Sequence, residues 1–229
     1  MKRPILLLVL CAAAACSGLD EGEGGVVALE VEIPDALDLE VAEQLQLAAR
    51  ALDVEGNEID ADISWRTSST AVSVDGTGLV TALAPGNATV QAVVGSLTSA
   101  AVPLVVGLRA DTLIISGDSV FVLPIESDPP AIATLTARLE SFDPAGPVDD
   151  RPVIFEITQP VAGETPVVQL SGGQQAVTVT TGADGVATVT VSAAAGAVPP
   201  DTAIVQIRAN RTRGAPVPGS GQRFIVLFQ

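Results

Sequence analysis

The stretch that decides the fold runs from residue 63 to residue 94 and reads ISWRTSSTAVSVDGTGLVTALAPGNATVQAVV. Short apolar segments alternate there with polar residues, which is the period of a strand that buries one face. Turn-forming residues separate the segments, first at Asp75-Gly76 and then at Pro85-Gly86-Asn87. Short strands between closely spaced turns predict a β-sandwich rather than a helical domain.

The same pattern continues on both sides of this stretch. Upstream, Leu29, Val31 and Ile33 alternate with two glutamates. Residues 37–52 are ambiguous, because their apolar positions also fit a helical stripe and their composition favours helix. We predict strands there, since sheet context overrides intrinsic propensity. Residues 26–107 then hold about seven strands, which suits one sandwich.

The order and spacing of these turns and apolar positions resemble the bacterial immunoglobulin-like domain of group 2. The resemblance implies an immunoglobulin-like sandwich over residues 26–107, with Trp65 as a large core anchor between the sheets. The alternative role for Trp65 is an exposed platform on which a sugar stacks. The residues that carry the resemblance are Leu45-Gln46-Leu47, Gly56-Asn57, residues 63–69, Val74-Asp75, residues 78–83 and residues 85–90.

Residues 108–229 form a second run of short strands, and hardly any linker separates it from the first. The turn pair Asp184-Gly185 lies between two alternating segments and predicts a β-hairpin. The expected strands are 112–116, 119–123, 132–139, 152–157, 167–170, 176–181, 186–193, 203–209 and 223–228.

This second run resembles the group 1 bacterial immunoglobulin-like domains of invasin- and intimin-type surface proteins. The resemblance implies a second sandwich, so the predicted fold class is all-β, with two tandem immunoglobulin-like sandwiches. Because Val106-Gly107-Leu108 joins them directly, we expect little motion between the domains and an elongated rod. The residues that carry the resemblance are 133–137, 152–156, 181–189 and 205–209.

The first 15 residues have the features of an export signal. Lys2 and Arg3 precede an apolar run over residues 5–15. As a helix this run would measure about 16 Å, well short of the ~30 Å hydrocarbon core of a bilayer. We therefore expect residues 1–15 to be a signal peptide that is removed.

The residues Ala13-Ala14-Ala15-Cys16-Ser17-Gly18 resemble the processing site of a bacterial lipoprotein precursor. The resemblance implies that Cys16 is acylated and anchors the chain to a membrane, in the outer membrane if the cell is Gram-negative. Residues 16–25 would then be the lipidated cysteine and a flexible acidic tether. Cys11 is a poorer candidate because bulky Leu10 precedes it. A plain secretory signal that leaves Cys16 as a free thiol is the alternative.

Composition excludes most catalytic classes. The chain has no His, Lys2 is its only lysine, and its formal net charge is −16. It therefore lacks a His base for a nucleophile, and it would repel nucleic acid. We also expect no cofactor.

Two groups of carboxylates, Asp149-Asp150 and the acidic residues of 53–62, are the remaining catalytic candidates. Both fall in predicted turns, where acidic residues are ordinarily solvated. A calcium ion bound by the 53–62 loop is an alternative. Ser68-Ser69 lacks a base that could activate either hydroxyl.

The sequence predicts a non-catalytic structural or adhesive module held at the cell envelope by a lipid. Its partner would be a protein or polysaccharide in the envelope or on another cell. Two alternatives stay open. One is a carbohydrate-binding module, and the other is an envelope-assembly component that binds a partner by adding a strand to an open sheet edge.

Overall fold

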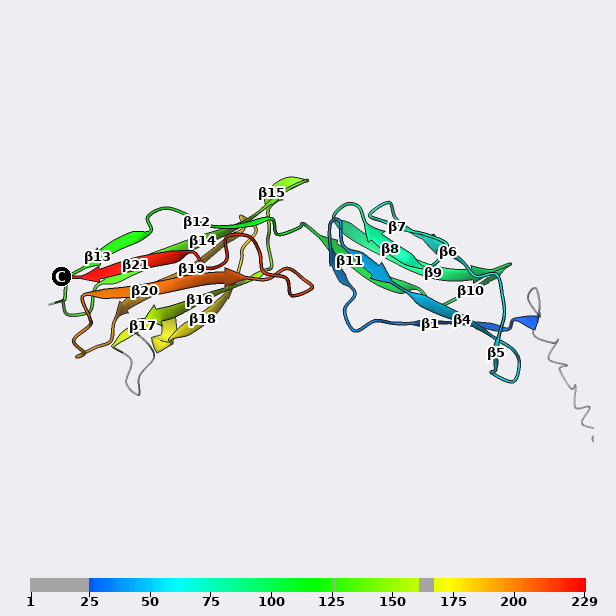
Figure 1. Ribbon diagram of the computed structural model, residues 1–229, viewed down its shortest axis with the longest axis horizontal. Coiled ribbons are helices and arrows are strands. Elements are labelled where there is room, and N and C mark those ends of the chain that lie inside the picture. The colour runs from blue at the N-terminus through cyan, green and yellow to red at the C-terminus, as the bar shows by residue number, and fades with distance from the viewer. Residues whose placement is uncertain (1–24, 126, 161–166) are drawn as a thin grey trace, which may run out of the picture.

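The computed structural model describes residues 25–125, 127–160 and 167–229, and strands dominate these ranges. Figure 1 shows two lobes that lie end to end along the long axis of the molecule. We call the described residues up to 107 the N-lobe and those from 108 onward the C-lobe. The predicted all-β class is confirmed.

The N-lobe contains strands β1 to β11, which form three hydrogen-bonded groups. These are β1-β4-β5, β3-β8-β7, and β10-β9-β11-β2 with β6 also paired to β9. The strands are β1 (Ala28–Glu32), β2 (Asp38–Glu40), β3 (Gln44–Gln46), β4 (Ala48–Leu52), β5 (Glu58–Ile59), β6 (Ser64–Thr67), β7 (Val72–Val74), β8 (Leu79–Ala82), β9 (Gly86–Val94), β10 (Leu97–Thr98) and β11 (Val102–Gly107).

Residues 37–52, which also fit a helical stripe, contain strands β2, β3 and β4, with a turn at Val41-Ala42. Leu45, Leu47 and Ala51 are buried, and exposed residues separate them as a strand requires. The backbone of β4 pairs with β1, where Arg50 lies opposite Glu30. Sheet pairing and burial therefore override the helix propensity of this segment.

The C-lobe contains strands β12 to β21 in two sheets. One has the order β12-β14-β19-β17 with β15 paired to β14, and the other has the order β13-β21-β20-β16-β18. The elements are β12 (Thr112–Ile115), β13 (Val120–Leu123), β14 (Ile132–Phe142), β15 (Ala145–Pro147), β16 (Pro152–Gln159), β17 (Val168–Leu170), the 3₁₀ turn η2 (Ser171–Gly173), β18 (Ala176–Thr180), β19 (Val186–Ala193), β20 (Thr202–Ala209) and β21 (Arg223–Phe228).

The predicted hairpin at Asp184-Gly185 is wrong. The turn itself forms, with Gly185 N–H donating to the Gly182 carbonyl at 2.8 Å. However, β18 pairs with β16 and β19 pairs with β14, so the turn carries the chain from one sheet to the other. Both strands direct alternate apolar side chains into the same core from opposite sheets. A turn motif specifies local backbone geometry but not the neighbour of each strand.

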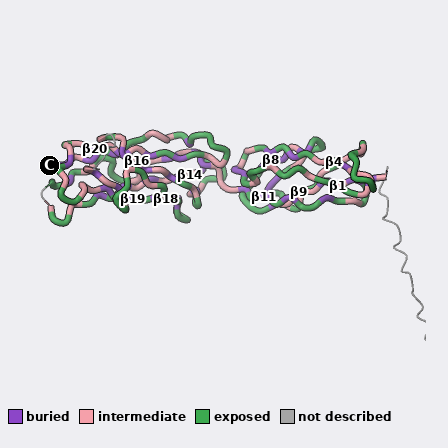
Figure 2. Tube along the Cα trace, turned by 90° about the horizontal axis from the view of Figure 1, so that it is seen from below, coloured by how far each residue is buried: buried purple, intermediate pink, exposed green. Residues whose placement is uncertain are grey.

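Each lobe has its own hydrophobic core. In the C-lobe the fully buried rings of Phe155 and Phe224 stack with centroids 6.4 Å apart. The main N-lobe core includes Leu39, Leu47 and Leu104. Figure 2 shows buried segments inside both lobes and exposed segments on the outside.

Candidate functional site

Of the carboxylates at residues 53–62, Asp53 stabilises a turn, whereas Glu58 lies in strand β5 and not in the turn that was predicted. Asp53 Oδ1 accepts hydrogen bonds from the N–H groups of Asn57 (2.8 Å) and Glu55 (2.9 Å). The Asn57 bond is the main reason why the pKa of Asp53 lies below its ordinary value. Asp149 and Asp150 are exposed on a loop. Within residues 25–125, 127–160 and 167–229, no group of three or more metal-binding side chains is placed to hold an ion.

The two serines after β6 also have local structural contacts. Ser68 Oγ accepts a hydrogen bond from Thr89 N–H at 2.9 Å. Ser69 Oγ accepts one from Ala71 N–H at 3.1 Å. Both side chains therefore shape the connection from β6 to β7.

Trp65 lies on the flank of the N-lobe core. It belongs to β6, packs against the main core cluster, and is half-buried. Its indole covers Gly78, whose φ is +83° and where a Cβ would lie 2.9 Å from ring atom Cζ2. The fully buried large apolar side chains of this lobe are leucines and valines. The role of Trp65 as core anchor therefore stays a prediction.

Replacing Trp65 with Ala is expected to cost about 2–4 kcal/mol of unfolding free energy, because a large side chain is lost from a half-buried position. Denaturant unfolding of the purified protein measures this. Leu83→Ala is the control, since Leu83 is 53% exposed and its loss should cost little. A cost below about 1 kcal/mol, together with weakened polysaccharide binding, would favour the sugar platform instead.

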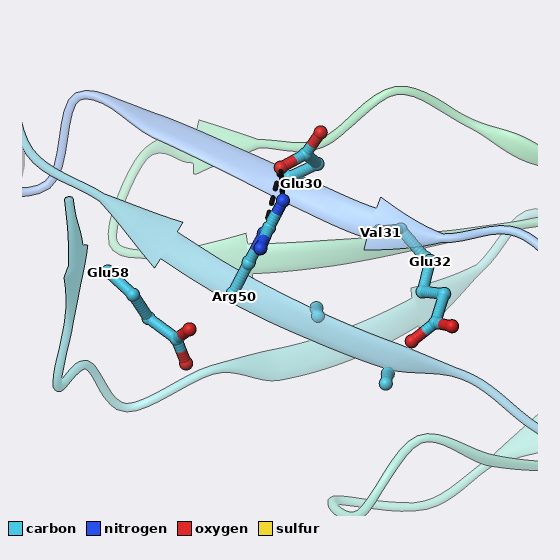
Figure 3. Close-up of a pocket in the computed structure, with 7 residues that line it drawn as sticks. Glu30, Val31, Glu32, Arg50 and Glu58 are labelled. Atoms are coloured by element: carbon cyan, nitrogen blue, oxygen red, sulfur yellow. Dashed lines mark hydrogen bonds and ion pairs between the residues drawn. The ribbon is translucent and has the colours of Figure 1, made fainter. Parts of the chain in front are cut away.

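A hollow of about 570 Å³ lies on the β1-β4-β5 sheet. Figure 3 shows Glu30 and Arg50 joined across neighbouring strands, with Glu32 and Glu58 on either side. The Arg50 Nη2–Glu30 Oε2 distance is 2.6 Å, and both side chains are 55% exposed. An ion pair this open to water contributes little to stability. The hollow is a solvated acidic face.

The most elaborate polar cluster lies where the lobes meet, and it is centred on Glu40. Glu40 ends β2, and its side chain is fully buried. Oε1 lies 3.1 Å from Nη2 of Arg151 and accepts hydrogen bonds from the N–H (3.1 Å) and hydroxyl (3.2 Å) of Thr212. Oε2 accepts one from Ala110 N–H at 3.3 Å. All three partners belong to the C-lobe, so one N-lobe carboxylate joins three separate C-lobe segments.

A second buried carboxylate, Asp111, lies beside the first at the start of the C-lobe. Its Oδ1 is 2.6 Å from Arg109 Nε and 3.6 Å from Arg211 Nη2. Its Oδ2 accepts a hydrogen bond from Phe142 N–H at 2.8 Å. Burial alone would raise the pKa of Asp111, but the Phe142 hydrogen bond and the two arginines outweigh it, and the pKa lies below its ordinary value. We call Glu40, Asp111 and their partners the junction cluster.

The lowered pKa of Asp111 predicts a pH dependence. Because the folded pKa lies below the unfolded one, this carboxylate stabilises the fold above about pH 4, and the contribution is lost as pH falls through the folded pKa. Asp111→Asn should therefore cost about 2 kcal/mol at pH 7 and progressively less toward pH 2. Thermal unfolding of both proteins across this range measures the difference. A stability difference between the two proteins that stays constant with pH would contradict the lowered pKa of Asp111.

The junction cluster was not predicted from the sequence. In sequence Glu40 is one acidic residue among many, and its partner Thr212 lies 172 positions away. The sequence feature that could have indicated the cluster is the distribution of the basic residues. In a chain with only 11 Lys and Arg residues, four arginines lie at this boundary: Arg109, Arg151, Arg211 and Arg213.

Cys16, the predicted lipidation site, lies outside the described residues. Among those that are described, no helix is both long and apolar enough to cross a bilayer.

Residues 33–106 match the family of bacterial Ig-like domains of group 2. This match covers less than half of the chain and lies within the N-lobe. This part of the chain therefore has the immunoglobulin-like fold that its sequence predicts.

Several solved structures are also similar to the chain. The Yersinia pseudotuberculosis adhesin InvE is 14% identical with a TM-score of 0.42, and the match covers 91% of this chain and 61% of that one. Domains 4 and 5 of the S-layer protein SbsC are 18% identical with a TM-score of 0.33, covering 89% and 98%. The D0-D1 domain of intimin is 18% identical with a TM-score of 0.31, covering 88% and 98%. No curated protein matches the sequence.

Proposed function

We propose that the protein is a non-catalytic structural module of the cell envelope, which is anchored by a lipid at Cys16 and holds its C-lobe at a fixed angle to its N-lobe. The junction cluster is the observation that carries this proposal. A connection meant only to link two domains needs no buried charge, because a flexible linker is sufficient. Here a fully buried carboxylate receives donors from three C-lobe segments.

The chemistry of the chain supports a non-catalytic role. It has no His and a single lysine, at position 2. Apart from Glu58, which lies in strand β5, the carboxylates and serines considered as catalytic candidates lie in turns, bends or loops. A sugar-binding module would need a platform of exposed aromatic faces, but Trp65 is half-buried against the core, and the exposed Phe142 is a single ring on the other lobe. A structural or adhesive role with a protein or polysaccharide partner therefore has the better support.

The anchor is tested by replacing Cys16 with Ser in the full precursor and comparing membrane and soluble fractions. We expect the wild type in the membrane fraction, with mass spectrometry showing an acylated N-terminal Cys16. The Cys16→Ser protein should be released or remain unprocessed. Cys11→Ser is the matched control, since it removes the other cysteine and should leave anchoring unchanged. A soluble wild type with an unmodified thiol would mean a plain secretory signal.

A further inference from the structure

Strand β6 presents an open edge on the flank of the N-lobe. β6 pairs with β9 in antiparallel register, and Ser68 N–H donates to the Thr89 carbonyl at 3.0 Å. Because hydrogen-bonded pairs alternate along an antiparallel ladder, residues 64, 66 and 68 are the ones whose backbone groups face β9. Trp65 lies opposite Ala92, whose N–H and carbonyl both bond to Ser99 on the other side of β9. The backbone groups of Trp65 and Thr67 therefore point away from β9, and no other described strand pairs with β6.

A shallow, open groove of about 530 Å³ lies beside this edge, between β6 and the neighbouring edge strand β7. Its apolar residues are Trp65, Val72, Val74 and Leu83, and Leu83 is 53% exposed. The other lining side chains are Ser or Thr, apart from Arg66. Unpaired backbone beside apolar side chains is the combination that binds an extended peptide by strand addition.

The charge of the groove indicates the kind of peptide. The chain has 27 acidic residues, yet none of those that the structure describes lines this groove. Seven arginines in the described ranges lie within 4 Å of a carboxylate, whereas Arg66 does not. Instead, the Arg66 side chain lies on the exposed face of the strand and donates a hydrogen bond of 2.9 Å to Gln91 Oε1. It offers a positive charge without a carboxylate partner on the exposed face of β6, where a side chain of an added strand could reach it.

We propose that the β6 edge binds an extended acidic segment of a partner protein by strand addition. The segment hydrogen-bonds to the backbone of Trp65 and Thr67, directs apolar side chains toward the groove, and places a carboxylate near Arg66. This inference is independent of lipid anchoring and goes beyond the proposed structural role.

The test uses the two-lobe protein and an acetylated, amidated heptapeptide, Thr-Val-Glu-Val-Thr-Val-Glu, whose alternation gives one apolar face and one acidic face. We expect saturable binding below about 1 mM, with the largest amide shift changes at residues 65 and 67 in NMR spectra. Arg66→Gln should weaken binding at least about fivefold, as should replacing both peptide glutamates with lysine. Arg223→Gln, which removes another arginine without a carboxylate partner, should leave affinity unchanged.

Three results would overturn the proposal. They are the absence of saturable binding at about 1 mM, amide shifts centred on another strand, and equal affinity of the Arg66→Gln and wild-type proteins. Arg66 is exposed and lies outside the core, so this variant should fold normally. Its unfolding midpoint checks that it does.

Discussion

Replacing Glu40 with Ala is expected to lower the unfolding free energy by about 3–5 kcal/mol, because the largely buried guanidinium of Arg151 then has no counter-charge. The N–H groups of Ala110 and Thr212 also lose their acceptor. Since all three donors belong to the C-lobe, the fixed angle between the lobes should be lost as well. Denaturant unfolding measures the first effect, and solution scattering measures the second as a broader range of molecular lengths.

The matched control is Glu30→Ala. Glu30 also pairs with an arginine, but both side chains of that pair are 55% exposed, so the expected cost is below about 1 kcal/mol. The double change Glu40→Ala with Arg151→Met should cost less than the sum of the two single changes. Each single change leaves a buried charge without its partner, whereas the double change removes both charges. If Glu40→Ala behaves like Glu30→Ala and scattering does not change, the junction does not hold the lobes.

Phe224→Ala is expected to cost about 3–5 kcal/mol, because it removes a fully buried ring from the centre of the C-lobe. The ring contacts Phe155 in a stacked geometry and Phe121 in a tilted one, so the cavity would be bordered by aromatic groups that cannot easily fill it. Unfolding followed by a C-lobe probe measures the loss.

Phe142→Ala is the control for this substitution. It is the same chemical change at a side chain that is 65% exposed, and it should alter stability by less than about 0.5 kcal/mol. Similar losses at both positions would mean that the stacked rings are not the centre of the core.

The strands could be predicted from the sequence because their signals are local. The segment at 186–193 shows this well, since alternation and a preceding turn define it and the observed β19 has the same bounds. The pairing of strands depends on residues far apart in the sequence. The Asp184-Gly185 turn therefore predicted a hairpin, although the strands on its two sides belong to different sheets. Glu40 illustrates the same limit for the site, because only the folded molecule brings it to Thr212.

The topology also sets the order in which parts of the molecule can be completed during synthesis. All residues of the N-lobe strands have been synthesised once the chain reaches residue 107. The second C-lobe sheet must wait for β21, which lies in its interior between β13 and β20. Glu40 is made early, but its partner Thr212 follows 172 residues later. The N-lobe can therefore fold with the Glu40 carboxylate still in water, and the angle between the lobes is set only after most of the chain has been synthesised.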